Sequence, residues 1–253
     1  MLQKERHDQI LSKLNIHGSV HVKEIAKEFK VTEDCIRKDL AILEKEGKLE
    51  RIHGGATCIR QNPQLYNVNS RKSVYLEEKK KVAQKAISLI QPDSMVFLGI
   101  STINIEIAKL IYEKNIKCTV VTNMIDIMQI FMQNSNVCLI FLGGNFNRTR
   151  DGFTGSIVNE CLKNYHFDLS FIGVVGIDLK GNKVTTYDVE DGLTKKQAIQ
   201  CCENTYLVVE GAKFEQDGNY VFSNLEDYKG IVTDIELNLK QRKILESKGL
   251  EII

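Results

Sequence analysis

Between residues 95 and 234, short apolar runs alternate with stretches of helical periodicity, and this alternation limits the fold more than any other feature of the chain. The runs have the length of buried strands and cover 95–99, 119–123, 137–144, 169–176, 206–211 and 230–234. Helical stretches near 102–112, 124–132, 156–163, 190–201 and 237–247 separate them, and a further helix through 77–90 comes before Pro92. Such alternation predicts an α/β fold, with a mostly parallel sheet covered by helices on both faces.

The first 57 residues have a different rhythm, with three helices and no long strand. Their apolar residues recur at helical spacing in three groups, which are Ile10, Leu11 and Leu14; Val22, Ile25, Ala26 and Phe29; and Ile36, Leu40 and Leu43. We expect Gly18 to end the first helix and Gly47 the third. Only residues 30–32 separate the second helix from the third, and so tight a turn fits a helix-turn-helix unit. Residues 48–55 then predict a short hairpin, or wing.

The segment between these regions contains Pro63, several asparagines and few apolar residues, which indicates a linker. We therefore predict a winged helix-turn-helix domain over 1–57, a linker over 58–74 and an α/β domain over 75–253. The length of 253 residues fits this division, because it corresponds to roughly one and a half to two ordinary domains.

Composition excludes several classes of protein. A net charge of +1 excludes a strongly basic packaging protein, but it allows a DNA-binding protein whose basic residues are clustered. The charged N-terminus lacks the apolar core of a signal peptide, and no apolar run approaches the ~20 residues that span a bilayer. The seven cysteines include no C-x-x-C pair, so we expect reduced, mostly buried thiols in a cytoplasmic protein, with neither a metal site nor a cofactor.

The spacing predicts a mainly basic outer face for the third helix of the first domain. With residues placed about 100° apart, Ile36, Leu40 and Leu43 define the buried side, and Glu33, Asp39 and Glu44 flank it. The opposite side carries Asp34, Arg37, Lys38, Ala41 and Lys45, and Thr32 is a good N-cap. The pairs Glu33–Arg37 and Asp34–Lys38 also fit an ordinary solvated helix face. The turn that follows, with Arg51 and His53, favours a recognition helix with a wing.

The first domain strongly resembles the DNA-binding domain of DeoR-family transcriptional regulators. The resemblance rests on GSV at 18–20, EIA at 24–26, IRKDL at 36–40, GKL at 47–49 and RIHGGA at 51–56. It implies that Thr32, Arg37 and Lys38 contact operator DNA and that Arg51 and His53 serve the wing. Cys35 stands where the family usually has threonine, so a weak donor replaces a hydroxyl at this position.

The second domain resembles the DeoR sensor domain, which is similar in fold to ribose-5-phosphate isomerase and glucosamine-6-phosphate deaminase. The landmarks are TVVTN at 119–123, LGG at 142–144, FIG at 171–173, TT at 185–186, KF at 213–214 and IVTD at 231–234. The resemblance implies a phosphorylated sugar effector and a repressor of a sugar-metabolism operon. Because helix-turn-helix proteins usually read paired half-sites, we also expect a homo-oligomer, a dimer or a tetramer.

In open α/β sheets, ligands bind beyond the carboxyl ends of the strands. Together with the resemblance, this rule selects Ser101 and Thr102 as donors to phosphate, Gly143 and Gly144 as points of close backbone approach, Lys213 as a cation, and Asp188 and Glu190 as acceptors for sugar hydroxyls. From spacing alone, Ser101 and Thr102 also fit a simple helix cap, and the two glycines a simple turn.

The phosphate loop departs from the family pattern. Residues 99–104 read Gly-Ile-Ser-Thr-Ile-Asn where the family usually has Asp-Ser-Gly-Thr-Thr-Thr, so a carboxylate, a glycine and two hydroxyls are lost. Two alternatives to an effector-controlled repressor follow. One is a constitutive repressor with a degenerate site. The other is an active sugar-phosphate isomerase or deaminase that uses Asp188, Glu190 or Glu210 as base, since His166 precedes a strand at the wrong end.

Overall fold

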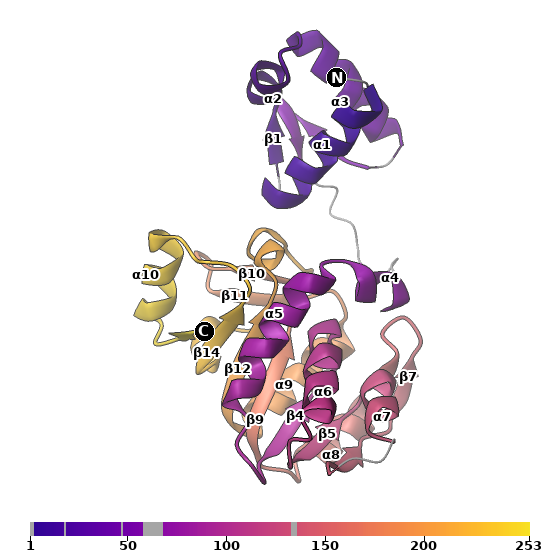
Figure 1. Ribbon diagram of the computed structural model, residues 1–253, viewed down its shortest axis with the longest axis vertical. Coiled ribbons are helices and arrows are strands. Elements are labelled where there is room, and N and C mark those ends of the chain that lie inside the picture. Colours follow the sequence, from indigo (N-terminus) through magenta and orange to yellow (C-terminus); the bar gives the residue numbers. More distant parts are fainter. Residues whose placement is uncertain (1–2, 18, 47, 58–67, 133–135) are drawn as a thin grey trace. The chain divides into compact units, whose positions relative to one another are not determined.

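The computed structural model describes residues 3–17, 19–46, 48–57, 68–132 and 136–253 (Figure 1). The chain divides into two compact units, 1–62 and 63–253. After the roles that the resemblance predicts for them, the first is called the DNA-binding unit and the second the sensor unit below. No helix within the described ranges is long and apolar enough to cross a membrane.

The DNA-binding unit consists of three helices and a small antiparallel sheet. The helices are α1 (Gln3–His17), α2 (Val22–Phe29) and α3 (Glu33–Lys45), and the strands β1 (Ser19–His21), β2 (Glu50–Ile52) and β3 (Gly55–Thr57) pair in the order β1-β3-β2. The three predicted helices and the wing are confirmed, but β1 was not predicted. The glycines expected to end two helices, Gly18 and Gly47, lie outside the described residues.

The core of this unit contains the apolar residues of the predicted helical pattern. Ile10, Leu14, Ile36 and Leu43 are fully buried, and Leu11 packs at the edge. Between α2 and α3 the backbone turns at Lys30, whose φ of 55° lies in the left-handed region. Such a single left-handed residue ends one helix and redirects the chain into the next.

The sensor unit is built on a seven-stranded parallel sheet in the order β15-β14-β12-β9-β4-β5-β6. Its strands are β4 (Met95–Leu98), β5 (Thr119–Thr122), β6 (Cys138–Phe141), β9 (Phe167–Gly173), β12 (Cys202–Val209), β14 (Gly230–Thr233) and β15 (Glu251–Ile252). Six of them are the six predicted strands. The predicted mostly parallel α/β fold is confirmed.

Helices cover both faces of this sheet (Figure 1). One apolar core lies under α5 (Leu76–Ala86), α6 (Thr102–Glu113) and α7 (Ile125–Phe131). The other core contains residues of α8 (Ser156–Leu162), α9 (Val189–Gln200) and α10 (Leu239–Ser247). The 3-10 turn η2 (Ile87–Leu89) extends α5 toward Pro92, as the sequence predicts.

Several short elements of the sensor unit were not predicted. These are α4 (Val68–Ser73), the hairpin of β7 (Asn145–Asn147) and β8 (Gly152–Thr154), the antiparallel sheet of β10 (Gly176–Asp178), β11 (Lys183–Thr186) and β13 (Tyr220–Ser223), and the turns η3 (Gly211–Glu215) and η4 (Leu225–Asp227). All of them have three to six residues, which is too short for a hydrophobic period to appear. Helix α4 lies inside the segment that we predicted as linker.

The expectation of mostly buried cysteines is wrong for those that the structure describes. All six described cysteines are free, but only Cys118 is buried, and Cys138 is exposed. Cys138 opens β6, one of the two edge strands of the sheet, which pairs only with β5 among the described strands of that sheet. The seventh, Cys58, lies outside the described residues.

Candidate DNA-binding surface and effector site

Helix α3 begins as the sequence predicts. The Thr32 hydroxyl accepts a hydrogen bond from the Cys35 backbone N–H at 3.3 Å, so Thr32 is the N-cap. Glu33 and Asp34 lie in the first turn, where negative charge complements the helix dipole. Because its side chain caps the helix, Thr32 is held at the start of the exposed face.

The outer face of α3 is mixed in charge and exposed. Arg37, Lys38 and Lys45 are all exposed. The Arg37 guanidinium contacts Glu33 at 2.6 Å and Asp34 at 2.7 Å. Exposed pairs of this kind contribute about 0–1 kcal/mol. The Arg37 pairs therefore cost little to exchange for DNA contacts.

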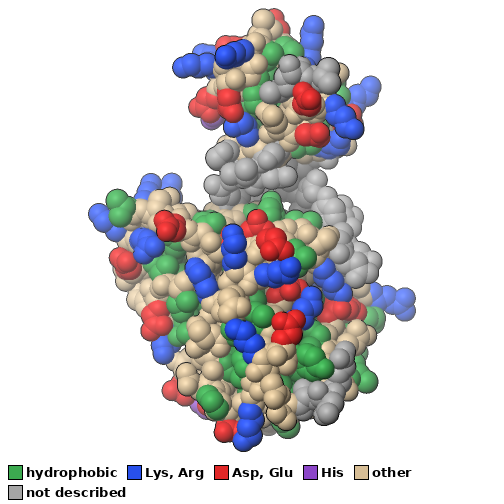
Figure 2. Space-filling model, in the orientation of Figure 1, with side chains coloured by type: hydrophobic (Ala, Val, Ile, Leu, Met, Phe, Trp, Pro, Cys, Tyr) green, Lys and Arg blue, Asp and Glu red, His purple; other side chains and the backbone are tan. Residues whose placement is uncertain are grey.

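The wing is a tight hairpin whose tip carries His53 and Gly54, both exposed. A Cβ at Gly55 would lie 2.0 Å from the Val20 carbonyl oxygen, so β1 and β3 can approach only with glycine here. Glu44 of α3 accepts from the Arg51 backbone N–H at 3.0 Å, which ties α3 to the wing. Lys and Arg side chains alternate with Asp and Glu over the visible face of this unit (Figure 2).

A buried ion cluster joins α1 to α3, and sequence reasoning missed it. Asp39 is 1% exposed and accepts from the Arg6 guanidinium at 2.7 and 3.1 Å. His7 and Gln3 contact the same carboxylate at 3.0 and 3.4 Å. Burial raises the pKa of Asp39, but the hydrogen bonds from Arg6 and His7 outweigh this effect, so the pKa lies below its ordinary value. Asp39 is therefore structural, unlike its exposed neighbours.

In the sensor unit, the predicted effector residues lie beyond the carboxyl ends of the parallel strands. Ser101 and Thr102 follow β4, Gly143 and Gly144 follow β6, and Lys213 follows β12. Asp188 caps α9, and its Oδ1 accepts from the Asp191 backbone N–H at 3.1 Å. Glu190 is exposed in the first turn of α9.

Several of these residues have local structural roles. The Ser101 hydroxyl caps α6 by accepting from the Ile103 N–H at 3.2 Å, and a Cβ at Gly173 would lie only 2.2 Å from its Oγ. A Cβ at Gly144 would meet Val158 at 2.6 Å, so this glycine lets α8 pack closely. A Cβ at Gly143 would meet nothing within 4 Å.

The altered loop after β4 is filled by an apolar side chain. Ile100 is buried, and a Cβ at Gly152 would lie 2.6 Å from its Cδ1. Asn104 is fully buried, and its amide donates to the carbonyl oxygens of Gly99 and Phe171 at 2.9 Å each. Two positions where the family usually has hydroxyls thus hold Ile100 and Ile103, which are both buried.

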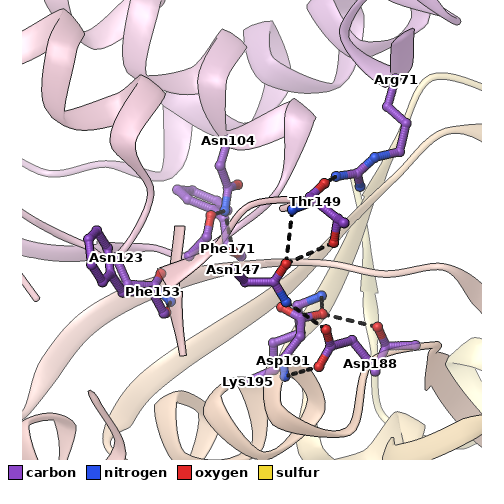
Figure 3. Close-up of polar contacts among 12 residues, drawn as sticks. Arg71, Asn104, Asn123, Asn147, Thr149, Phe153, Phe171, Asp188, Asp191 and Lys195 are labelled. Carbon is purple, nitrogen blue, oxygen red and sulfur yellow. Dashed lines mark hydrogen bonds and ion pairs between the residues drawn. The ribbon is translucent and has the colours of Figure 1, made fainter. Parts of the chain in front are cut away.

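A cluster of cations lies at this edge of the sheet, and most of its members were not predicted. Its members lie close enough for the charge of one to shift the pKa of another. They are the cations Arg71, Lys79, Arg150, Lys195 and Lys213 and the carboxylates Asp191 and Glu210. Figure 3 shows Arg71 reaching from α4 toward Thr149, with Asn147, Asp188, Asp191 and Lys195 close by. These seven charged residues are called the cation cluster below.

The closest ion pair of the cation cluster is almost completely buried. Lys195 Nζ lies 2.6 Å from Asp191 Oδ2, which also accepts from the Thr186 hydroxyl at 3.0 Å. Burial alone raises the pKa of Asp191, but the charges of Lys195 and Arg150 reverse the effect and lower it. Burial lowers the pKa of Lys195, which means that its charge is only partly compensated.

Several buried polar atoms around the cation cluster have no partner among the described residues. They are Arg71 Nε, Arg150 Nη2, Asn104 Oδ1 and Asn123 Oδ1. Buried polar groups nearly always have hydrogen-bond partners, so such atoms call for a ligand or another explanation. By contrast, the groups around a hollow at the amino ends of β4, β9 and β12 are satisfied: Asp168 accepts from the Met95 N–H at 2.7 Å, and Lys229 donates to Asn204 at 2.9 Å.

The chain matches two family models, that of the DeoR-like helix-turn-helix domain over 6–62 and that of the DeoR C-terminal sensor domain over 75–235. It is 32% identical to the lactose phosphotransferase system repressor of Streptococcus mutans, with all of both chains covered. It is 30% identical to the HTH-type transcriptional repressor GlcR of Bacillus subtilis, over all of this chain and 96% of GlcR.

Among solved structures, the chain is similar to ribose 5-phosphate isomerase A from Methanocaldococcus jannaschii, with 14% identity and a TM-score of 0.41 over 55% of each chain. It is also similar to eIF2B delta from Chaetomium thermophilum, with 11% identity, a TM-score of 0.46, and 65% and 58% of the two chains covered. The predicted likeness to glucosamine-6-phosphate deaminase stays a prediction. The matches to both domain models and to full-length relatives lead to one conclusion: the chain belongs to the DeoR family of DNA-binding transcriptional regulators.

Proposed function

We propose that this protein represses a sugar-metabolism operon by binding operator DNA as a homo-oligomer, and that a phosphorylated sugar releases it. Two relatives that match over nearly their whole length carry the name of a repressor. They are GlcR of Bacillus subtilis and the lactose phosphotransferase system repressor of Streptococcus mutans. The observation that carries the proposal is the cation cluster, because five cations beside two carboxylates favour a ligand with several negative charges. Because its target is chromosomal DNA, we expect the protein to act in the cytoplasm.

In this proposal the operator is read by α3 and the wing. Arg37 and Lys38 contact bases or phosphates, Thr32 contacts the backbone at the start of the helix, and Lys45, Arg51 and His53 fix its position. These roles need side chains that DNA can reach, and those of Arg37, Lys38, Lys45, Arg51 and His53 are all exposed.

On the effector side, Lys213 lies within the cation cluster, and Asp188 lies beside it. The buried acceptors Asn104 Oδ1 and Asn123 Oδ1 are further candidates to bind sugar hydroxyls. Thr102 and Gly143 remain candidates for contact with the ligand. Ser101 caps α6 and Gly144 lets α8 pack closely, and these roles explain the two residues without a ligand.

An enzymatic function is less well supported. Asp188 accepts hydrogen bonds on both oxygens, from the Asp191 N–H and from Asn147 at 2.8 Å. Glu210 is buried and lies 3.7 Å from Lys79 Nζ. His166 is exposed just before β9, at the amino end of the sheet. A general base needs a free acceptor within reach of the substrate. Asp188 and Glu210 already have partners and His166 lies at the opposite edge of the sheet, which leaves the exposed Glu190 as the remaining candidate base.

Replacing Arg37 with alanine is expected to weaken operator binding by about 1–3 kcal/mol, the usual cost of losing one specific contact. The measurement is an electrophoretic shift titration on the promoter region of the protein's own gene. Arg37→Lys keeps the positive charge but removes the planar guanidinium that can donate two hydrogen bonds to one base. It therefore separates base recognition from electrostatic attraction to the phosphates. Lys240→Ala, which removes an exposed cation from α10, is the control. Unchanged binding by Arg37→Ala would remove α3 from the interface.

The effector is tested by thermal denaturation of the full chain with a panel of hexose and pentose phosphates and their parent sugars. A ligand that binds only the native state raises the melting temperature. We expect at least one sugar phosphate to do so while its parent sugar does not. If no member of the panel stabilises the protein, the constitutive repressor with a degenerate site becomes the better account.

A further inference from the structure

Two arginines of the cation cluster have donors that no described residue uses. Arg150 lies between β7 and β8, is 4% exposed, and its Nη2 has no partner among the described residues. Arg71 lies on α4, and its Nε is buried and equally unpartnered there. Its Nη2 donates only a long bond of 3.4 Å to the Thr149 carbonyl oxygen. The Arg71 guanidinium thus contacts the residue next to Arg150, and each of the two arginines has a donor to spare.

The electrostatics of this place favour an anion. Burial lowers the pKa of Arg71 to about 10, and repulsion from Arg150 adds to the effect. Burial also lowers the pKa of Lys213, again with repulsion from both arginines. Arg150 is buried, whereas Arg71 and Lys213 are half-buried. Holding partly desolvated cations that repel one another is costly, and an anion bound between them offsets the cost.

We propose that Arg71 and Arg150 form the subsite for the phosphate group of the effector, and that Arg71 transmits its occupancy to α4. This inference rests on the proposed function. A guanidinium can donate two parallel hydrogen bonds to phosphate oxygens. Arg71 Nε and Arg150 Nη2 each offer the phosphate of a phosphomonoester a donor that no described residue uses. They take over from the loop after β4, in which buried Ile100 and Ile103 replace two hydroxyls.

Helix α4 is suited to transmit ligand binding, because it is a short element held by side chains from the rest of the sensor unit. Lys79 of α5 donates to the carbonyl oxygens of Arg71 and Val74 at 2.5 and 2.6 Å. Lys72 of α4 contacts Asp126 of α7 at 2.6 Å. In the sequence, α4 is the first described element after the DNA-binding unit. A ligand held by Arg71 therefore fixes the sensor element that is nearest to that unit along the chain.

The subsite is tested by calorimetric titration of the full chain with inorganic phosphate and with the stabilising sugar phosphate of the panel. Arg150→Gln is expected to weaken binding of both at least tenfold, which corresponds to about 1.4 kcal/mol. The matched control is Arg148→Gln, an exposed arginine two residues away, which should leave the Kd within twofold. Arg150→Lys keeps the charge and should fall between them. It replaces Arg150→Gln if the latter does not fold.

Transmission is tested by operator binding at saturating sugar phosphate. Arg150→Gln should still release operator once the ligand is raised enough to saturate it, because its defect is one of affinity. Arg71→Gln should retain operator under the same saturation, because the ligand no longer holds α4. If the substitutions acted only by removing one positive charge, both variants would respond to the saturating ligand in the same way. Different operator release by Arg150→Gln and Arg71→Gln is therefore specific to transmission through α4.

The outcomes separate this inference from the proposed function. If the sugar phosphate binds wild type and Arg150→Gln equally well, the protein senses phosphate elsewhere and the subsite is wrong. If Arg71→Gln releases operator as wild type does, transmission through α4 is wrong. If neither sugar phosphate nor inorganic phosphate binds the wild-type protein, both the subsite and the proposed effector fail. Binding of inorganic phosphate alone would support the anion subsite and contradict a sugar effector.

Discussion

Replacing Asp191 with alanine is expected to destabilise the sensor unit by about 3–5 kcal/mol, the usual cost of breaking a buried ion pair by removing one partner. Asp191 is 2% exposed and lies 2.6 Å from Lys195 Nζ. Its loss leaves Lys195 as a buried cation close to Arg71 and Arg150, which repel it. The measurement is urea denaturation of the full chain, followed by a signal from the sensor unit.

The matched control breaks an exposed pair in the same unit. Glu160 lies 2.5 Å from Lys163, and both side chains are more than half exposed. Glu160→Ala should cost less than about 1 kcal/mol, because water already screens the two charges. A cost for Asp191→Ala no larger than that of the control would show that the cation cluster does not depend on this carboxylate.

The second large effect is expected in the DNA-binding unit, where Asp39→Ala should cost about 3 kcal/mol. The substitution leaves Arg6, whose side chain is only 11% exposed, without its main partner. A domain of about 60 residues buries a small core and is stable by only a few kcal/mol. We therefore expect most of the unit to unfold near 37 °C, with loss of operator binding, while the sensor unit keeps its own melting transition.

The control for this prediction is Glu46→Ala, which removes an exposed pair with Lys48 at 2.8 Å. It should leave the transition of the DNA-binding unit nearly unchanged. An equal effect of the two substitutions would mean that the contacts between α1 and α3 do not depend on Asp39.

Asp39 also predicts how this unit responds to acid. Its pKa is lowered in the folded state, from an ordinary value of 3.8. A carboxyl group whose pKa is lower in the folded state stabilises the protein at any pH above its pKa in the unfolded state. This stabilisation is lost as the pH falls through the pKa of the folded state. Stability contributed by Asp39 should therefore be present at neutral pH and disappear below about pH 4. The acid transition of Asp39→Ala should lack this component.

Most of the fold could be predicted because long hydrophobic patterns carry it. The helical spacing of Ile36, Leu40 and Leu43 indicates α3, and the apolar runs at 95–99 and 119–123 indicate two strands of a mostly parallel sheet. Each signal extends over several residues, as a helical period in α3 and as an uninterrupted apolar run in each strand. The N-cap at Thr32 was equally visible, since its side chain acts within four residues of itself.

The candidate effector site was visible only in outline. The rule for parallel sheets points to the edge at which the cation cluster lies, but it cannot reveal which distant segments fold over that edge. Arg71 belongs to a short helix within a segment that reads as linker, and Arg150 to a loop between three-residue strands. The same is true of Arg6 and Asp39, which are 33 residues apart in the sequence. Pairings over such separations depend on tertiary structure, and a single sequence shows no period that marks them.

The central claim is that a phosphorylated sugar bound to the sensor unit changes the affinity of the protein for its operator. The most direct measurement is a titration of labelled operator DNA with the full chain, with and without a saturating concentration of the stabilising sugar phosphate. We expect about 5- to 150-fold weaker binding with the ligand, the range of typical coupling free energies, and no change with the parent sugar. An operator affinity that is the same with and without a sugar phosphate that stabilises the protein would contradict the account.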